Sequence, residues 1–156
     1  MRRALYGNDV NETVDGQLIV LYDGVCGLCN ATVRFILRHD REARFRFAPL
    51  QGKGAARLAA RHGFDPSDLD TVYLVVDHGG AGERVLARSA AIFAVLRTLG
   101  GRWRLVSALG WLPRPLTDAG YRFVASVRYR LFGKLSACPI PRPEWRNRFL
   151  TDDTEE

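Results

Sequence analysis

The sequence is poor in cysteine. Three cysteines occur in 156 residues, and an odd number of thiols cannot all pair within one chain. A chain of this length buries about 68–70% of the surface that it exposes when unfolded, so it needs no disulfides to stabilise a core. The cysteines are therefore free for chemistry, and a disulfide-rich scaffold is excluded.

Signals for membrane insertion and secretion are also missing. No uninterrupted apolar stretch approaches the ~20 residues that a membrane-spanning helix needs. Residues 1–14 contain no basic segment followed by an apolar one, which is the pattern of a secretory leader. Together with the odd number of cysteines, these absences predict a soluble protein of the reducing cytoplasm.

Acidic residues are scarce in one part of the chain. The overall composition, 47% hydrophobic and 26% charged, is typical of a globular protein. The formal net charge of +6 comes entirely from residues 102–134, which contain seven basic side chains and a single acidic one, Asp118. Any anionic partner would therefore meet the C-terminal third of the chain.

Hydrophobic periodicity predicts an α/β fold, with strands and helices alternating up to residue 99. Apolar or alternating segments predict strands at residues 18–22, 44–47, 72–76 and 84–87. Helical spacing predicts helices that begin at Cys26, Ala55 and Ser89, followed by further helices at residues 103–111 and 116–132. We divide the chain into a flexible lead-in (1–17), a single domain (18–145) and an acidic tail (146–156).

Two local expectations concern the predicted helices. Ser89 can cap the helix that it begins, because its hydroxyl can accept a hydrogen bond from a free amide there. In the last helix Leu116, Phe123, Val127 and Leu131 recur at helical spacing, so we expect this face to pack on the domain.

Two cysteines stand where the first strand gives way to a helix, in Cys26-Gly27-Leu28-Cys29. Helix N-terminal amides favour negative charge, so the first thiol can ionise, and helical spacing places Cys29 one turn further on and toward the core. A thiolate can attack a substrate disulfide, and a second thiol can then resolve the mixed disulfide. The motif predicts thiol-disulfide exchange, with Cys26 as the exposed attacking thiol and Cys29 as the resolving one.

Asp23 ends the strand next to this pair. A buried carboxylate there could accept the proton of Cys29 during resolution. Equally, an Asp-Gly pair before a helix often braces a turn through its side-chain oxygens. The sequence supports both interpretations of Asp23.

The alternatives for the cysteines are a structural role and a metal site. Free cysteine is often simply buried. Structural zinc takes four Cys or His ligands, and Cys138, His39, His62 and His78 form no second close pair, which leaves only a two-cysteine half-site shared between subunits. We expect no metal, no cofactor and three histidines that lie in solvated turns. Cys138 could be an additional redox thiol or a packed one, and we favour the packed one because nothing local except basic surroundings would lower its pKa.

Residues 22–30, YDGVCGLCN, resemble the signature of the DCC family of thiol-disulfide oxidoreductases, D-x-x-C-x-x-C after the first strand. Asp23, Cys26 and Cys29 match it residue by residue. Weaker likeness extends over residues 18–145, through 47–50, 88–91 and the positions of Asp118, Tyr121, Arg128 and Tyr129. The resemblance implies a thiol-disulfide oxidoreductase with a thioredoxin-like fold, in which a mixed sheet is flanked by helices, and the predicted element order agrees with that fold.

The sequence departs from the wider thioredoxin pattern just before the third strand. Thioredoxin-like proteins usually carry a cis-proline there, beside the cysteine pair, where the substrate chain docks. Here Leu69-Asp70-Thr71 precedes Val72 without a proline. We therefore expect the partner to be a low-molecular-weight thiol or one dedicated disulfide-containing protein.

A non-catalytic binding module is the rival function. The basic, aromatic stretch 103–132 could contact an anionic membrane surface or a protein partner. Its apolar spacing favours instead a packed helix with an arginine-rich solvent face, so we expect at most weak membrane-surface contact. No fold signature of a nucleic-acid-binding protein is present, and we expect no specific nucleic-acid partner.

Overall fold

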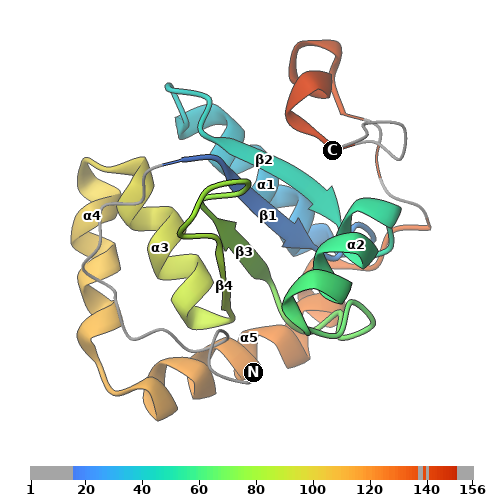
Figure 1. Ribbon diagram of the computed structural model, residues 1–156. Coiled ribbons are helices and arrows are strands. Elements are labelled where there is room, and N and C mark those ends of the chain that lie inside the picture. The colour runs from blue at the N-terminus through green and yellow to red at the C-terminus, as the bar shows by residue number, and fades with distance from the viewer. Residues whose placement is uncertain (1–15, 137–138, 140, 151–156) are drawn as a thin grey trace.

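The computed structural model describes residues 16–136, 139 and 141–150. A four-stranded mixed sheet forms the centre of the molecule (Figure 1). Its strands are β1 (Leu18–Tyr22), β2 (Phe45–Pro49), β3 (Tyr73–Val76) and β4 (Arg84–Ala87). They lie in the order β2-β1-β3-β4, with β1 parallel to β2 and β3 antiparallel to both of its neighbours. The predicted fold class, a thioredoxin-like mixed sheet flanked by helices, is confirmed.

Alternating residues of β1 explain how the helices are distributed. Its even-numbered residues belong to the core under α1 (Gly27–His39) and α3 (Ser89–Leu99), whereas Ile19 and Leu21 pack with α2 (Lys53–His62) on the other face. All five β1 side chains are buried, as a central strand covered on both faces requires. Because β1 is a central strand, the turn that joins it to α1 lies at the middle of the sheet.

The chain continues through α4 (Arg102–Ser107), the 3-10 helix η2 (Ala108–Trp111), α5 (Arg114–Phe132) and the 3-10 helix η3 (Pro143–Arg148). The first of these helices lies against α3, and α5 runs across one end of the sheet (Figure 1). After η3 the chain returns to β2, where the Leu150 amide donates to the Phe47 carbonyl at 2.8 Å. The folded part thus extends past residue 145.

The face of α5 that enters the molecule is not the one that its apolar spacing suggested. Leu116, Phe123 and Leu131 are 59%, 68% and 69% exposed, and of the four predicted residues only Val127 is half-buried. The expectation that this stripe packs on the domain is therefore wrong. Arg128, on another face of the helix, is buried instead. The sheet end offers polar backbone groups, and polar side chains of α5 satisfy them, as described below.

Two smaller expectations are also wrong. Ser89 does not cap α3: Arg88 holds the cap position with φ 57°, and the Ser89 hydroxyl donates to Asp118. Nor are the histidines solvated. His62 and His78 both contact Glu83 and are largely shielded from solvent.

The third histidine, His39, ends α1 and stacks near Phe35 and Trp103 with ring centroids at 4.4 and 5.5 Å. Neighbouring rings and a carboxylate therefore shield the three imidazoles.

Two further results concern membrane-spanning helices and metal sites. Among the residues that the structure describes, no helix has the length and apolar character needed to cross a bilayer. Within the same residues, no three His, Cys, Asp or Glu side chains gather in a way that could hold a metal ion.

Candidate active site

The dithiol motif lies at the junction of β1 and α1. Cys26 is the N-cap residue of α1, with extended backbone angles, and its Sγ accepts a hydrogen bond from the Cys29 amide at 3.3 Å. The partial positive charge of the helix N-terminus favours a negative charge at this sulfur. The predicted position of Cys26 at the start of the helix is confirmed, and Cys29 follows on the core side.

The turn before Cys26 is fixed by two side chains. Asp23 Oδ1 accepts from the Val25 amide at 3.1 Å. Asn30 Nδ2 donates to the carbonyl oxygens of Gly24 and Cys26 at 2.8 and 2.9 Å. A short turn with its carbonyls held in this way sets the position of the cap thiol relative to the helix axis.

A segment from the far end of the chain covers this turn. We call residues 132–135 the cover segment. The Gly27 amide donates to the Gly133 carbonyl at 3.2 Å, and the Leu135 amide donates to the Val25 carbonyl at 2.7 Å. Gly27 leaves room for this approach, because a Cβ there would stand 2.2 Å from the Phe132 carbonyl oxygen.

As a result, Cys26 is fully buried, and the expectation of an exposed attacking thiol is wrong for this conformation. Cys26 forms an antiparallel bridge with Lys134 of the cover segment. Sequence reasoning missed this because the covering residues follow more than a hundred positions later, although Gly27 itself was a signal of close backbone approach.

Cys29 has a different environment. It is 8% exposed and lines a cavity of about 350 Å³ between α1, α3 and α5, whose wall Cys26 does not reach. Burial, the hydrogen bond with Cys26 and the charge of Cys26 raise the pKa of the Cys29 thiol to about 12. Cys29 is therefore a protonated thiol at neutral pH, and both cysteines are free in this structure.

Asp23 is buried and both of its oxygens are occupied. Oδ1 accepts from Gln51 Nε2 at 2.8 Å as well as from the turn, and Oδ2 accepts from the Tyr129 hydroxyl. Arg128 Nη2 lies 3.5 Å from the same Oδ2, so a buried cation offsets the buried carboxylate. The turn contact fits the bracing interpretation of Asp23, while its charge is felt at Cys29 as well.

The loop before β3 is held by α5. The Tyr121 hydroxyl accepts from the Val72 amide at 2.8 Å and donates to the Asp70 carbonyl at 3.1 Å. Burial raises the pKa of Tyr121 to about 12, so the hydroxyl stays protonated and able to donate. Arg128 Nη2 donates to the Leu69 carbonyl at 2.9 Å. The loop has no proline at the usual place before β3. Its Leu69 carbonyl, Asp70 carbonyl and Val72 amide are already hydrogen-bonded to side chains of α5.

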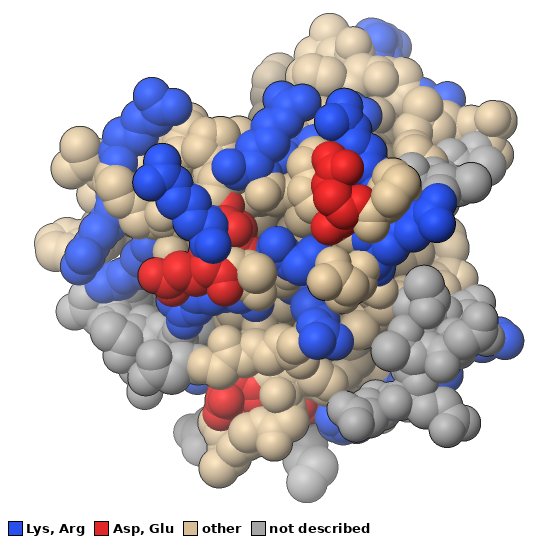
Figure 2. Space-filling view, turned by 90° about the horizontal axis from the view of Figure 1, so that it is seen from above, with Lys and Arg blue, Asp and Glu red and all other residues tan. Residues whose placement is uncertain are grey.

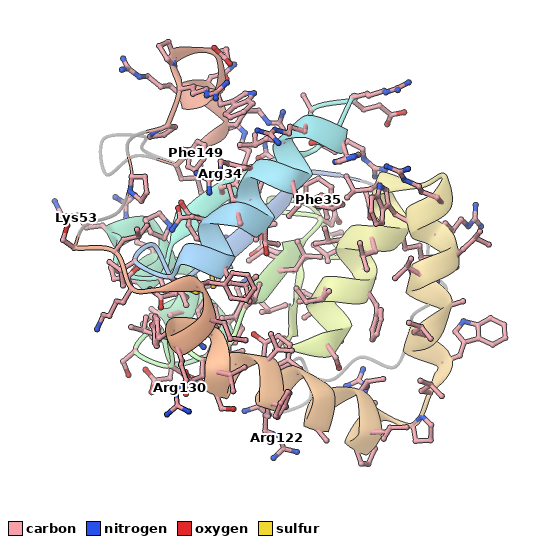
Figure 3. All side chains as sticks on the ribbon, turned by 180° about the vertical axis from the view of Figure 1, so that it is seen from behind. Arg34, Phe35, Lys53, Arg122, Arg130 and Phe149 are labelled. Atoms are coloured by element: carbon pink, nitrogen blue, oxygen red, sulfur yellow. The ribbon has the colours of Figure 1, made fainter. Side chains whose placement is uncertain are left out.

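Sequence reasoning assigned no role to Tyr121, Arg128 or Tyr129. They entered only as part of a weak likeness, because an arginine beside a tyrosine on a polar helix face is usually solvated. Figure 3 shows the usual case on the same helix: Arg122 and Arg130 point away from the body of the molecule. No local signal separates Arg128 from them, since its partner Asp23 is 105 positions away.

The end of the molecule away from α5 has mixed charge. In Figure 2 basic side chains predominate on this face, and a few acidic ones lie among them. Cys138, predicted to be packed, lies outside the described residues.

Comparison with known proteins identifies related chains. A family model described as DCC1-like thiol-disulfide oxidoreductase matches residues 20–134, from β1 to the cover segment. The uncharacterized protein YuxK of Bacillus subtilis (strain 168) is 36% identical over 132 residues, which are 85% of this chain and 93% of that protein. A chloroplastic DCC family protein of Arabidopsis thaliana is 33% identical over 127 residues, 81% of this chain and 71% of that protein. No solved structure gave a significant match.

Proposed function

The chain belongs to the DCC1-like thiol-disulfide oxidoreductase family, and on that premise we propose that it exchanges disulfides through Cys26 and Cys29. The observation that carries this proposal is the position of the Cys26 sulfur at the N-cap of α1, where it accepts a hydrogen bond from the Cys29 amide. A helix N-terminus favours a thiolate, which is the reactive form in exchange.

The two thiols take different parts in the proposed reaction. The Cys26 thiolate attacks one sulfur of a substrate disulfide, forms a mixed disulfide and releases the other sulfur as a thiolate. Cys29 then loses its proton and attacks the Cys26 sulfur, so that the second substrate sulfur leaves and a Cys26–Cys29 disulfide remains. Because the pKa of Cys29 is raised to about 12, resolution needs a group that takes its proton.

Access to Cys26 requires the cover segment to move. Two backbone hydrogen bonds, from Gly27 to Gly133 and from Leu135 to Val25, hold this segment over the turn. Each such bond contributes only about 0.5–1.5 kcal/mol net, so local opening without unfolding of the sheet is feasible. In the proposal a disulfide substrate reaches Cys26 in the opened form.

Asp23 has two proposed roles that the substitution Asp23→Asn separates. If Asp23 only braces the turn, the amide keeps the hydrogen bond from Val25 and the mixed disulfide at Cys26 does not accumulate. If Asp23 takes the proton of Cys29, the mixed disulfide at Cys26 accumulates in single-turnover experiments. The occupied oxygens support the bracing role, and rapid-quench mass spectrometry of the mixed disulfide decides between the two roles.

Thiol trapping across a series of glutathione redox ratios tests the redox function. Reversible loss of two alkylation sites, mapped to Cys26 and Cys29, is the expected result for the intact chain. Cys29→Ala should accumulate a glutathione adduct on Cys26, whereas the matched control Cys138→Ala should retain the reversible pair. Thiols that stay alkylatable at every ratio would refute the proposal.

The rival function, a binding module, has one supporting observation. Large hydrophobic side chains that are strongly exposed cluster in α4, η2 and α5, next to an excess of arginine. Salt-sensitive co-sedimentation with anionic vesicles, retained when both Cys26 and Cys29 are replaced by serine, would favour this function. Under the redox proposal we expect only weak membrane-surface contact, no specific nucleic-acid partner and a cytoplasmic location.

A further inference from the structure

The two sulfurs of the motif face different surroundings. Cys26 lies beneath the cover segment and is fully buried, whereas Cys29 lines the cavity between α1, α3 and α5. A small molecule in this cavity would meet Cys29 without any movement of the cover segment. The closed conformation therefore gives access to one sulfur of the pair only.

The cavity is suited to an apolar group. Its volume of about 350 Å³ falls within the ~300–1,000 Å³ of small-ligand sites. Aliphatic and aromatic side chains form most of its wall: Val20, Val33, Val72, Ile92, Phe93 and Val124. A strongly charged molecule would lose its hydration there without sufficient compensation. The cavity thus discriminates against polar thiols such as glutathione.

Arg128 brings a cation to the cavity wall, and acidic side chains of the chain itself pair with it. Arg128 lines the cavity and its side chain is 4% exposed. Its two terminal nitrogens bind Asp23, Asp70 and Leu69, whereas its buried Nε–H makes no hydrogen bond. The Nε atom is itself inaccessible to solvent, so a molecule in the cavity does not contact it.

We infer that this cavity binds a low-molecular-weight thiol with an apolar body, and that this thiol reduces the oxidised pair by attack on Cys29. The inference rests on the proposed redox function and names its small-molecule partner. Peptide substrates would instead use Cys26 in the opened form.

The proposed step balances within the pair. The thiol R–SH loses its proton to solvent, and its thiolate attacks the Cys29 sulfur of the Cys26–Cys29 disulfide. That bond breaks, a Cys29–S–S–R bond forms, and the electron pair stays on Cys26, where the helix N-terminus and the Cys29 amide stabilise a thiolate. A second R–SH attacks the R sulfur and releases R–S–S–R, and both cysteines end as thiols.

Gly120 offers a way to fill the cavity without strain. It lies in α5 and lines the cavity, and a Cβ added there meets no atom within 4 Å. Leucine is also a better helix former than glycine, so Gly120→Leu should not weaken the helix. Ala119→Leu is the matched control, because it adds a similar side chain at the next position, which is exposed like Gly120 but does not line the cavity.

The experiment reduces the oxidised chain with benzyl mercaptan or 2-mercaptoethanol at equal thiolate concentration. The apolar thiol should react about tenfold faster or more, as expected from burial of a phenyl group. Gly120→Leu should abolish this preference, while Ala119→Leu should keep it. Rapid quenching and peptide fragmentation should place the benzyl adduct on Cys29.

The outcomes separate the two proposals. Equal rates for both thiols, a preference that survives Gly120→Leu, or a benzyl adduct on Cys26 would overturn the cavity inference and leave the redox function standing. A chain in which Cys26 and Cys29 never form a disulfide would overturn the redox function and, with it, the inference.

Discussion

Residues 18–99 fully or partly bury their large hydrophobic side chains, whereas residues 102–135 expose most of theirs. Phe45, Phe47 and Leu74 are inaccessible to solvent in the first region. In the second, Leu105 and Trp111 are 79% and 81% exposed. The second region nevertheless inserts polar side chains of α5 between the dithiol turn and the loop before β3. The first region therefore supplies the stability of the fold. The second region supplies polar contacts to the site and covers it.

The largest expected effect comes from removing equivalent rings from the two regions. Phe47→Ala deletes a fully buried ring that packs against Phe149, and should cost about 3–5 kcal/mol of unfolding free energy. Phe123→Ala deletes a ring that is 68% exposed, and should change stability by about 0.5 kcal/mol or less. Urea unfolding measures both values. Similar losses for the two variants would mean that the stripe on α5 packs in solution.

The same contrast explains what could be predicted from the sequence. The five apolar residues of β1 predicted a buried strand, and the structure confirms it. A strand with apolar side chains on both faces must be covered on both faces. The stripe of Leu116, Phe123 and Leu131 has equally regular spacing, but its neighbours are set by the tertiary fold. Helical periodicity predicts an amphipathic helix, and it does not say which face meets the domain.

The candidate site divides in the same way. The position of Cys26 at the N-cap follows from local order, strand then turn then helix, and was predictable. Its burial depends on the cover segment, and the surroundings of Asp23 depend on Arg128 and Tyr129, all of which join the site from more than a hundred positions away. Such contacts leave no periodic signal in a single sequence.

A smaller effect is expected from the ion pair that joins the two regions. Arg128→Met leaves Asp23 buried without its cation, which should cost about 3 kcal/mol, at the lower end for broken buried pairs because Asp23 keeps its other hydrogen bonds. Arg122→Met, on the exposed face of α5, is the control and should be nearly neutral.

The double variant Asp23→Asn/Arg128→Met tests whether charge is the cause. It removes both charges, so it should be less destabilised than Arg128→Met alone, as determined by urea unfolding. A double variant whose loss equals the sum of the two single losses would show that Asp23 and Arg128 do not interact energetically.

The smallest of the three effects is expected at the loop before β3. Tyr121→Phe removes the hydroxyl that pairs with the Val72 amide and the Asp70 carbonyl, and should cost about 1–2 kcal/mol because a partly buried donor loses its partner. Hydrogen exchange should accelerate at the Val72 amide while the β1 amides keep their protection. Ser126→Ala, which removes a hydroxyl from an exposed position of the same helix, should change neither quantity. If Val72 exchanges at the same rate in Tyr121→Phe, α5 does not hold this loop, and the division of labour between the two regions fails at the position where substrates of thioredoxin-like proteins dock.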